Sequence, residues 1–142
     1  MNERGSGCQC LKELCAQNDF TPNTVVQGAW ALLLSRYSRE EDVVFGAVRA
    51  CRKSSIEGAD SIVGLLMNTI PMRVGVPADT ALIPWLKELR AQHVNLRDYE
   101  HSPLVEVQKW SDVPPPTPLF ESIIVFDNYD LNTKLQTQGG KW

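Results

Sequence analysis

The sequence predicts an α/β fold in which helices pack against a small buried sheet, and three observations support this. Two long segments, residues 21–37 and 78–100, carry apolar side chains at helical spacing. Between them, Val43–Ala50 and the run from about Leu65 to Val76 are nearly continuous in apolar residues, as in strands covered on both faces. A third strand is expected within Leu119–Tyr129. Helices that alternate with strands of this kind indicate an α/β sandwich.

The first long helix has clear start signals. Thr21 is a good N-cap, and Pro22 suits the first helical position, where its missing N–H costs nothing. The following apolar residues form a wide stripe that should bury most of this helix: Val25, Val26, Ala29, Leu32, Leu33 and Tyr37. Before it, a short helix is expected over Cys10–Asn18, while residues 1–10 are expected to be frayed or disordered.

The second half of the chain contains two further helices and a proline-rich segment. Residues 78–100 tolerate Pro84 in the first helical turn and should bury one face made of Leu82, Trp85, Leu86, Leu89, His93 and Leu96. "SPLVEVQKW" predicts a short helix capped by Ser102, with Pro103 at its first position. "SDVPPPTP" has four prolines, which predict a stiff, extended loop. Residues 131–142 are polar and are expected to form a flexible tail.

Composition and charge limit the function classes. The 142 residues suit one domain, with 43% hydrophobic and 22% charged content, and a formal net charge of −3 gives no electrostatic reason to expect nucleic acid or an anionic membrane as partner. No apolar run is long enough to span a membrane. The N-terminus has no apolar core after its charges and therefore does not resemble a secretory signal, so we expect a cytoplasmic location.

The four cysteines do not predict a metal site. Cys8, Cys10 and Cys15 follow a C-x-C-x4-C spacing, but no second pair stands at ligand spacing and neither histidine lies nearby. Cys51 is isolated from them in the sequence. We expect reduced thiols, in keeping with cytoplasmic redox conditions.

No set of residues in the sequence assembles a catalytic site by itself. The glycine patterns of nucleotide sites are absent, and so is the G-x-S-x-G pattern of serine hydrolases. His93 falls on the apolar face of a helix, which favours a packed, hydrogen-bonded structural role. His101, in "YEHSPL", stands next to a helix start, where a neutral imidazole could cap the helix or line a cleft.

Four other polar residues are weaker candidates. Asp127 and Asn128 close the last expected strand, a position typical of α/β active-site rims and equally of any strand-to-turn transition. Arg52 and Lys53 follow the first strand and could hold an anion, although a solvated loop explains them as well.

The most informative stretch is "IVGLLMNTIPMR", Ile62–Arg73, an apolar run interrupted by Asn68, Thr69 and Pro71. It resembles the "VGxFxNTxPxR" signature of the condensation domains of nonribosomal peptide synthetases. "NTVVQGAWALLLSRYSREEDVVFGAV" is similar to the family's preceding helix and strand, "YEHSPLVEVQ" to its "(H/N)QxxPFExI" motif, and "PLFESIIVFDNY" to its "PLFxxxxxFxNY" strand. The matches keep the family order over about residues 11–130.

The resemblance implies a fold and a role. It implies the C-terminal lobe of a condensation domain, a chloramphenicol acetyltransferase-like α/β sandwich with a mixed sheet flanked by helices, here incomplete. Such domains have two lobes with a tunnel between them, and form an amide bond between two thioester-bound substrates. Carrier protein domains would be the partners, and their phosphopantetheine arms would hold the substrates, so no cofactor would be bound directly.

The family also supplies expected site residues. Its catalytic His-His-x-x-x-Asp-Gly motif lies in the N-terminal lobe, and this sequence has no His-His pair. The resemblance therefore implies no catalytic residue here, and neither His93 nor His101 matches the missing motif. It places Asn68, Thr69, Arg52 and His101 at the substrate tunnel. It also assigns a bridging arm toward the other lobe, made of Trp110, Pro114, Pro115 and Pro116.

Local departures from the family affect one loop in particular. After the first strand the family commonly reads Ser-Gly-Arg, whereas this chain reads Ala50-Cys51-Arg52, which loses the small turn. The apolar stretch Leu65, Leu66 and Met67 lacks the phenylalanine that the family has before the Asn-Thr pair, and Leu104 replaces an aromatic residue. These two changes are apolar and tolerable.

Three functional interpretations follow. In the first, the chain is part of a condensation domain and is inactive alone. It would then be either a truncated remnant or a half-domain that an N-terminal lobe on another chain completes. We favour the remnant because both ends run into unrelated polar sequence. The second is a non-catalytic module that docks carrier proteins. The third, a stand-alone acyltransferase, is disfavoured because it needs the absent histidine; it would require His101 to act across an oligomer interface. A lobe without its partner should also expose an apolar patch.

Overall fold

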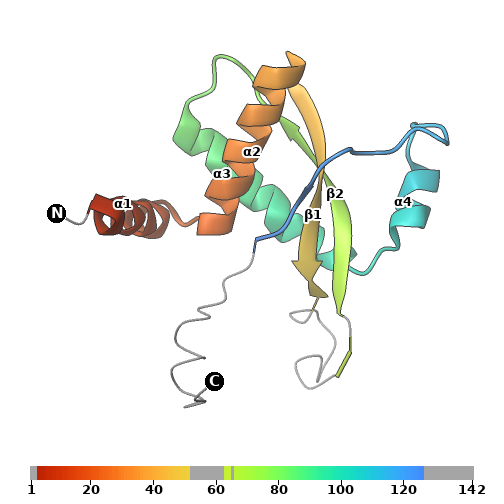
Figure 1. The fold of residues 1–142 in the computed structure, drawn as a ribbon, viewed down its shortest axis with the longest axis horizontal. Helices are drawn as coiled ribbons and strands as arrows, with labels where there is room; N and C mark the ends of the chain where they lie inside the picture. Colours follow the sequence, from red (N-terminus) through yellow and green to blue (C-terminus); the bar gives the residue numbers. More distant parts are fainter. Residues whose placement is uncertain (1–2, 52–62, 65, 127–142) are drawn as a thin grey trace, which may run out of the picture.

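A computed structural model of the chain describes residues 3–51, 63–64 and 66–126, with side chains described from residue 9 onward (Figure 1). Eight elements follow one another along this described part: α1 (Glu3–Asn18), α2 (Pro22–Ser38), β1 (Asp42–Ala50), β2 (Met67–Gly75), α3 (Leu82–Asn95), the 3-10 helix η3 (Leu96–Tyr99), α4 (Leu104–Trp110) and β3 (Ile123–Ile124). Helices and strands therefore alternate as the sequence predicts.

These strands form one mixed sheet in the order β2-β1-β3. β1 and β2 pair antiparallel over their full length, from Asp42 opposite Gly75 to Ala50 opposite Met67. β3 runs parallel to β1 and pairs only through Ile123 and Ile124. The third strand is thus much shorter than the expected Leu119–Tyr129, of which the last three residues lie outside the described part.

One face of this sheet carries the core. Alternate residues of β1 and β2 point to the helices and are at most 6% exposed: Val43, Phe45, Ala47, Ile70, Met72 and Val74. α2 and α3 cross each other over this face (Figure 1). The other face is only half covered, with Val44 and Val48 partly buried and Arg73 exposed. The expectation that these strands are buried on both faces therefore holds for one face only.

The start of α2 confirms the predicted capping. Thr21 is the N-cap with an extended backbone, and its Oγ1 accepts a hydrogen bond from the Thr24 backbone N–H at 3.3 Å. Pro22 is the first helical residue. The cap satisfies one of the N–H groups that an α-helix leaves without an internal partner.

The buried face of α2 is not the predicted apolar stripe. The buried residues are Thr24, Gln27, Gly28 and Ala31, whereas Val26, Leu33 and Tyr37 are 37%, 44% and 83% exposed. The reason is the close approach of α3, since a Cβ on Gly28 would lie only 2.7 Å from Leu86 Cδ2. Gly28 allows this contact, and Val26, Leu33 and Tyr37 are rotated outward, whereas Val25 and Leu32 of the predicted stripe are partly buried and pack against the core.

α3 follows its prediction more closely. Trp85, Leu86, Leu89 and His93 are buried, and Trp85 Nε1 donates a hydrogen bond to the Gly75 carbonyl at 2.7 Å. Leu82, expected on the same face, is the first residue of the helix and is instead 54% exposed. Leu96 belongs to η3 and packs against the core.

Two helix starts differ from expectation. α1 begins at Glu3 rather than at Cys10, so the N-terminal segment continues the helix that Leu11, Leu14 and Cys15 anchor against the core. α4 begins at Leu104 with Pro103 as N-cap and no side-chain cap, so the predicted Ser102 cap is wrong. Pro103 itself adopts the extended conformation that an N-cap requires.

The proline-rich segment turns back on α4 instead of extending away. Thr117 N–H donates to the Pro114 carbonyl at 3.0 Å, and the Gln108 amide donates to the carbonyls of Val113 and Thr117 at 3.0 and 3.2 Å. The chain then crosses the open face of the sheet toward β3 (Figure 1). We call residues 118–122 the crossing segment. It explains why β3 is short, because Phe120 in it packs over β1 before pairing starts.

Gly46 should be essential for this crossing. A Cβ at Gly46 would lie 2.6 Å from Phe120 Cε2 and 2.9 Å from Thr69 Cγ2. We therefore expect Gly46→Ala to lower the free energy of unfolding by about 1–3 kcal/mol, measured by urea denaturation. Gly75→Ala is a matched control in the neighbouring strand, because a Cβ there would meet nothing within 4 Å. Equal losses in the two variants would contradict the packing of Phe120 on Gly46.

Candidate functional site

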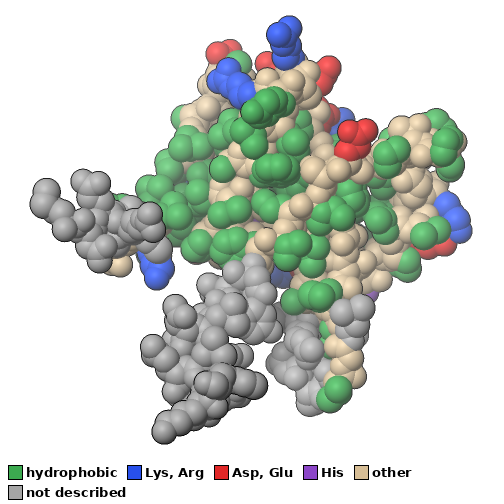
Figure 2. Space-filling view, in the orientation of Figure 1, with side chains coloured by type: hydrophobic (Ala, Val, Ile, Leu, Met, Phe, Trp, Pro, Cys, Tyr) green, Lys and Arg blue, Asp and Glu red, His purple; other side chains and the backbone are tan. Residues whose placement is uncertain are grey.

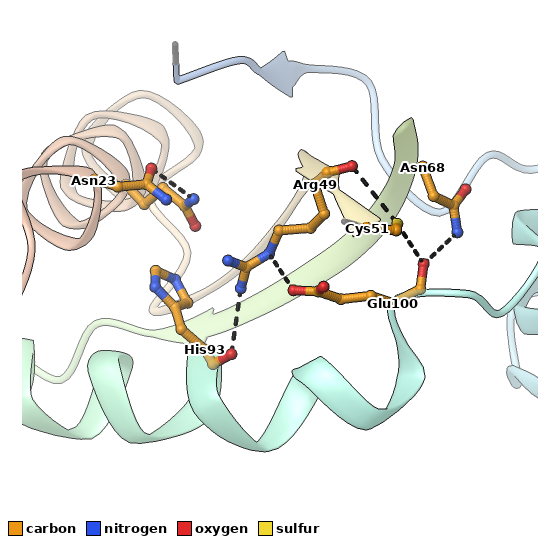
Figure 3. Close-up of polar contacts among 7 residues, drawn as sticks. Asn23, Arg49, Cys51, Asn68, His93 and Glu100 are labelled. Atoms are coloured by element: carbon orange, nitrogen blue, oxygen red, sulfur yellow. Dashed lines mark hydrogen bonds and ion pairs between the residues drawn. The ribbon is translucent and has the colours of Figure 1, made fainter. Parts of the chain in front are cut away.

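Polar side chains gather where β1 ends and β2 begins, next to the segment that joins η3 to α4 (Figure 3). Three of them reach that segment: Arg49 from β1, Cys51 from directly after β1, and Asn68 from β2. Their partners are Glu100 and Ser102, on either side of His101. We call these five residues the polar clamp.

The side-chain amide of Asn68 makes hydrogen bonds within this clamp. Its Nδ2 donates to the Glu100 carbonyl at 2.9 Å and to the Ser102 carbonyl at 2.8 Å. Its Oδ1 accepts a hydrogen bond from the Thr69 backbone N–H at 2.9 Å. Both amide hydrogens are therefore used, and Asn68 links the start of β2 to the peptide segment around His101.

Arg49 and Glu100 form a buried ion pair behind Asn68. Arg49 Nε lies 3.8 Å from Glu100 Oε1, and the two side chains are only 14% and 9% exposed. Arg49 Nη2 also donates to the His93 carbonyl at 3.4 Å. Burial lowers the pKa of Arg49, and the Glu100 carboxylate opposes that effect. The guanidinium therefore ties β1 to the end of α3 and to the His101 segment.

Cys51 fills the place where the family resemblance predicts a small Gly turn. It is 4% exposed, and its Sγ donates to the Glu100 carbonyl at 3.3 Å. Burial and, after it, the Glu100 carboxylate raise the pKa of the thiol. The cysteine therefore contributes a protonated donor to the clamp rather than a nucleophile.

His93 is packed as predicted, but without the expected ring hydrogen bond. It is 2% exposed, and its Nε2 has no hydrogen-bond partner among the residues that the structure describes. Burial lowers its pKa to about 4, and Arg49 and Arg90 add to the effect. The ring is therefore neutral near pH 7, and its burial excludes contact with a bulky substrate.

The predicted tunnel residues do not all lie together. Asn68 and the His101 segment are in contact, and His101 itself is exposed. Thr69, the next residue in β2, points to the opposite face of the sheet, beside Gly46 and the crossing segment. Arg52 lies outside the described residues, as do three weaker candidates: Lys53, Asp127 and Asn128.

The predicted bridging arm is exposed. Trp110, at the end of α4, is 70% exposed, and Pro114, Pro115 and Pro116 also lie at the surface. Apolar side chains are exposed elsewhere too, on α2 and around β3, and Figure 2 shows many hydrophobic side chains across the face of the molecule in view. Around β3 these are Ile123, Val125 and Phe126.

Sequence reasoning missed Arg49, Cys51 and Glu100 as members of the site. Arg49 did carry a signal, because a charged residue inside an otherwise apolar strand needs a partner when it is buried. Nothing in the sequence identified that partner as Glu100, which lies far along the chain. In the described part of the chain, no group of three His, Cys, Asp or Glu residues is placed to hold a metal ion.

The fold and the clamp define a small α/β lobe with a three-stranded mixed sheet and an exposed histidine loop at the strand ends. A family model described as "Condensation domain" matches residues 6–141. The chain belongs to the condensation-domain family of nonribosomal peptide synthetases. Its fold is accordingly of the chloramphenicol acetyltransferase-like type.

Curated relatives agree with this assignment. The chain is 51% identical over 120 residues to a linear gramicidin synthase of Brevibacillus parabrevis, covering 84% of this chain and 2% of that protein. It is 43% identical over 132 residues to chondramide synthase cmdD of Chondromyces crocatus, covering 93% of this chain and 3% of that protein. The chain thus spans a few per cent of the length of these relatives.

Solved structures give the same result. The crystal structure of holo T3CT matches with a TM-score of 0.70 and 30% identity, over 78% of this chain and 26% of that one. The starter condensation domain of a rhizomide synthetase matches with a TM-score of 0.60 and 25% identity, over 72% of this chain and 23% of that one.

The described helices of this chain include none that is long and apolar enough to cross a membrane.

Proposed function

We propose that the chain forms the C-terminal-lobe wall of a condensation tunnel in which amide bonds are made between carrier-bound aminoacyl or peptidyl thioesters. The observation that carries this proposal is the polar clamp, which holds the exposed His101 loop against the strand that contains the Asn-Thr pair. His101 would then line the tunnel, and the family resemblance assigns Thr69 and Arg52 to it as well. Carrier proteins would be the partners, in the cytoplasm.

The proposed reaction sets what this lobe must and cannot do. The acceptor amine attacks the thioester carbonyl, a C–N bond forms, the C–S bond breaks, and the proton of the amine is transferred to the departing pantetheine thiolate. The reacting groups must be held together, and a positioned group must orient the proton. This chain has no His-His-x-x-x-Asp-Gly motif, and His93 is buried. We therefore propose that it is inactive alone and requires an N-terminal lobe.

Trp110 and the three prolines would contact that second lobe. A large aromatic side chain that is 70% exposed is the kind of residue that anchors protein interfaces. The Gln108 hydrogen bonds hold the proline segment against α4, so this surface is organised before any partner binds. The arm would act as a preformed contact rather than as a loose linker.

A complementation experiment tests the proposal. The chain is mixed with a separately produced N-terminal lobe that carries the His-His motif and with two loaded carrier proteins, and the amide product is measured by mass spectrometry. We expect product only when both lobes are present, and none when the second histidine of the motif is replaced by Ala. Trp110→Ala should weaken association at least tenfold, whereas Tyr37→Ala, also highly exposed but on α2, should not.

Other outcomes would change the conclusion. Amide formation by the chain without the second lobe would overturn the proposed inactivity. Failure of the lobes to associate would exclude a half-domain. Binding of a phosphopantetheinylated carrier protein, seen as NMR shifts without any product, would instead assign a docking module.

A further inference from the structure

His101 is exposed, but the peptide on both sides of it is fixed. The Glu100 carbonyl accepts hydrogen bonds from Asn68 Nδ2 and from Cys51 Sγ, and the Ser102 carbonyl accepts the second Asn68 bond. Ser102 N–H donates in turn to the Tyr99 carbonyl at 3.0 Å. The backbone around His101 is thus held by the sheet, and the His101 side chain is left at the surface.

Asn68 is the only side chain in the described structure that binds both carbonyls that flank His101. A primary amide has only two N–H groups, and here each of them makes a short hydrogen bond to one of these carbonyls. No N–H donor of Asn68 is therefore left for a substrate. Its oxygen already accepts a bond from the Thr69 backbone N–H. A substrate that accepts a hydrogen bond from Asn68 would therefore have to break one of its two bonds to the loop.

We infer that Asn68 is a positioning residue, which holds residues 100–102 so that the His101 side chain is presented at the tunnel wall. This inference rests on the proposed function for the tunnel and goes beyond it by assigning separate tasks to the two residues. Asn68 holds the loop, and His101 meets the carrier-bound thioester substrates. The buried Arg49–Glu100 pair supports the same segment from behind.

Hydrogen exchange on the chain itself tests the positioning. In Asn68→Ala, the amide of Ser102 should exchange about tenfold faster or more, because both bonds to the loop are lost, while Phe45 in the sheet core should be unaffected. Asn68→Asp should be at least as disruptive, since it sets a carboxylate oxygen against two carbonyls. Thr69→Val, the neighbour on the opposite face, is the matched control.

Comparing the Ser102 exchange rates of Asn68→Ala and Asn68→Asp separates a positioning role of Asn68 from simple space filling. If Asn68 only fills space, the isosteric Asp variant should behave like the wild type and better than Ala. Such a result, or unchanged exchange at Ser102 in both variants, would overturn the inference. This measurement needs no catalysis, so it gives an answer even if the complementation experiment yields no amide product.

A double-mutant cycle in the complemented reaction tests the route of action. If Asn68 acts through His101, the Asn68→Ala/His101→Ala double variant should be no slower than His101→Ala alone. Both single variants should lower kcat/KM by at least tenfold. Additive losses would show that Asn68 touches the substrate itself and would overturn the inference, while leaving the proposed function in place. Loss of product in every mixture that contains the wild-type chain would contradict the proposed function instead.

Discussion

Replacing Glu100 by Gln should lower the free energy of unfolding by about 3 kcal/mol, because the buried Arg49 guanidinium would lose its counter-charge. Both side chains are largely removed from water, at 14% and 9% exposure. The separation of 3.8 Å is long for an ion pair, so we expect a loss at the lower end of the range for broken buried pairs. The Gln side chain keeps the shape of Glu, and the backbone carbonyl that binds Asn68 is unchanged. Urea denaturation at pH 7 measures the loss.

A second ion pair in the same chain supplies the control. Lys109 and Glu106 are only 2.8 Å apart, but their side chains are 63% and 42% exposed. Glu106→Gln should therefore cost no more than about 0.5 kcal/mol, despite the shorter distance. The charge-free pair Arg49→Met/Glu100→Gln should recover part of the loss, since no unpaired charge is left buried. Equal effects of Glu100→Gln and Glu106→Gln would contradict the buried pair.

Acidification should destabilise the fold through His93. Its folded-state pKa of about 4 lies below the ordinary value of 6.5, so the unfolded chain takes up the proton first as the pH falls. The stability contributed by neutral His93 is complete above about pH 6.5 and is lost progressively down to about pH 4. The pKa difference corresponds to about 3 kcal/mol. Urea denaturation at several pH values within this window measures the slope.

One variant isolates the cause. His93→Leu places an apolar side chain in the buried position and should flatten the slope between pH 6.5 and 4. Carboxylates contribute to the slope in both proteins, so the comparison is of the difference between the variant and the wild type. A His93→Leu variant with an unchanged slope would contradict the lowered pKa of His93.

The sequence predicted helices and strands reliably where interactions between neighbouring residues determine them. Thr21 and Pro22 begin a helix because the hydroxyl accepts a backbone N–H bond and the proline needs none. The two long strands were found because their apolar runs are continuous. Local reasoning failed at Ser102, which the sequence suggested as a cap; its carbonyl instead binds a side chain from β2.

The prediction of which face of a helix or strand is buried was less reliable, because it depends on which other element packs against that face. On α2 the apolar stripe is the larger hydrophobic surface, yet Gly28 faces α3 because only a small residue admits Leu86 there. On β2 the alternation of side chains separates Asn68 from Thr69, although the motif presents them as a pair. Which of them faces the helices is set by Ile70, Met72 and Val74, which must be buried.

Neighbouring residues alone were enough to identify the family, the order of helices and strands, and the absence of a His-His pair, because motifs and local preferences are written in short stretches of chain. The use of Asn68 emerged only from the tertiary structure. Its partners, Glu100 and Ser102, are more than thirty positions away, and no local pattern identifies which carbonyls a buried amide will meet. Packing of α3 against the sheet brings them together, and the need to satisfy buried polar groups then makes the clamp.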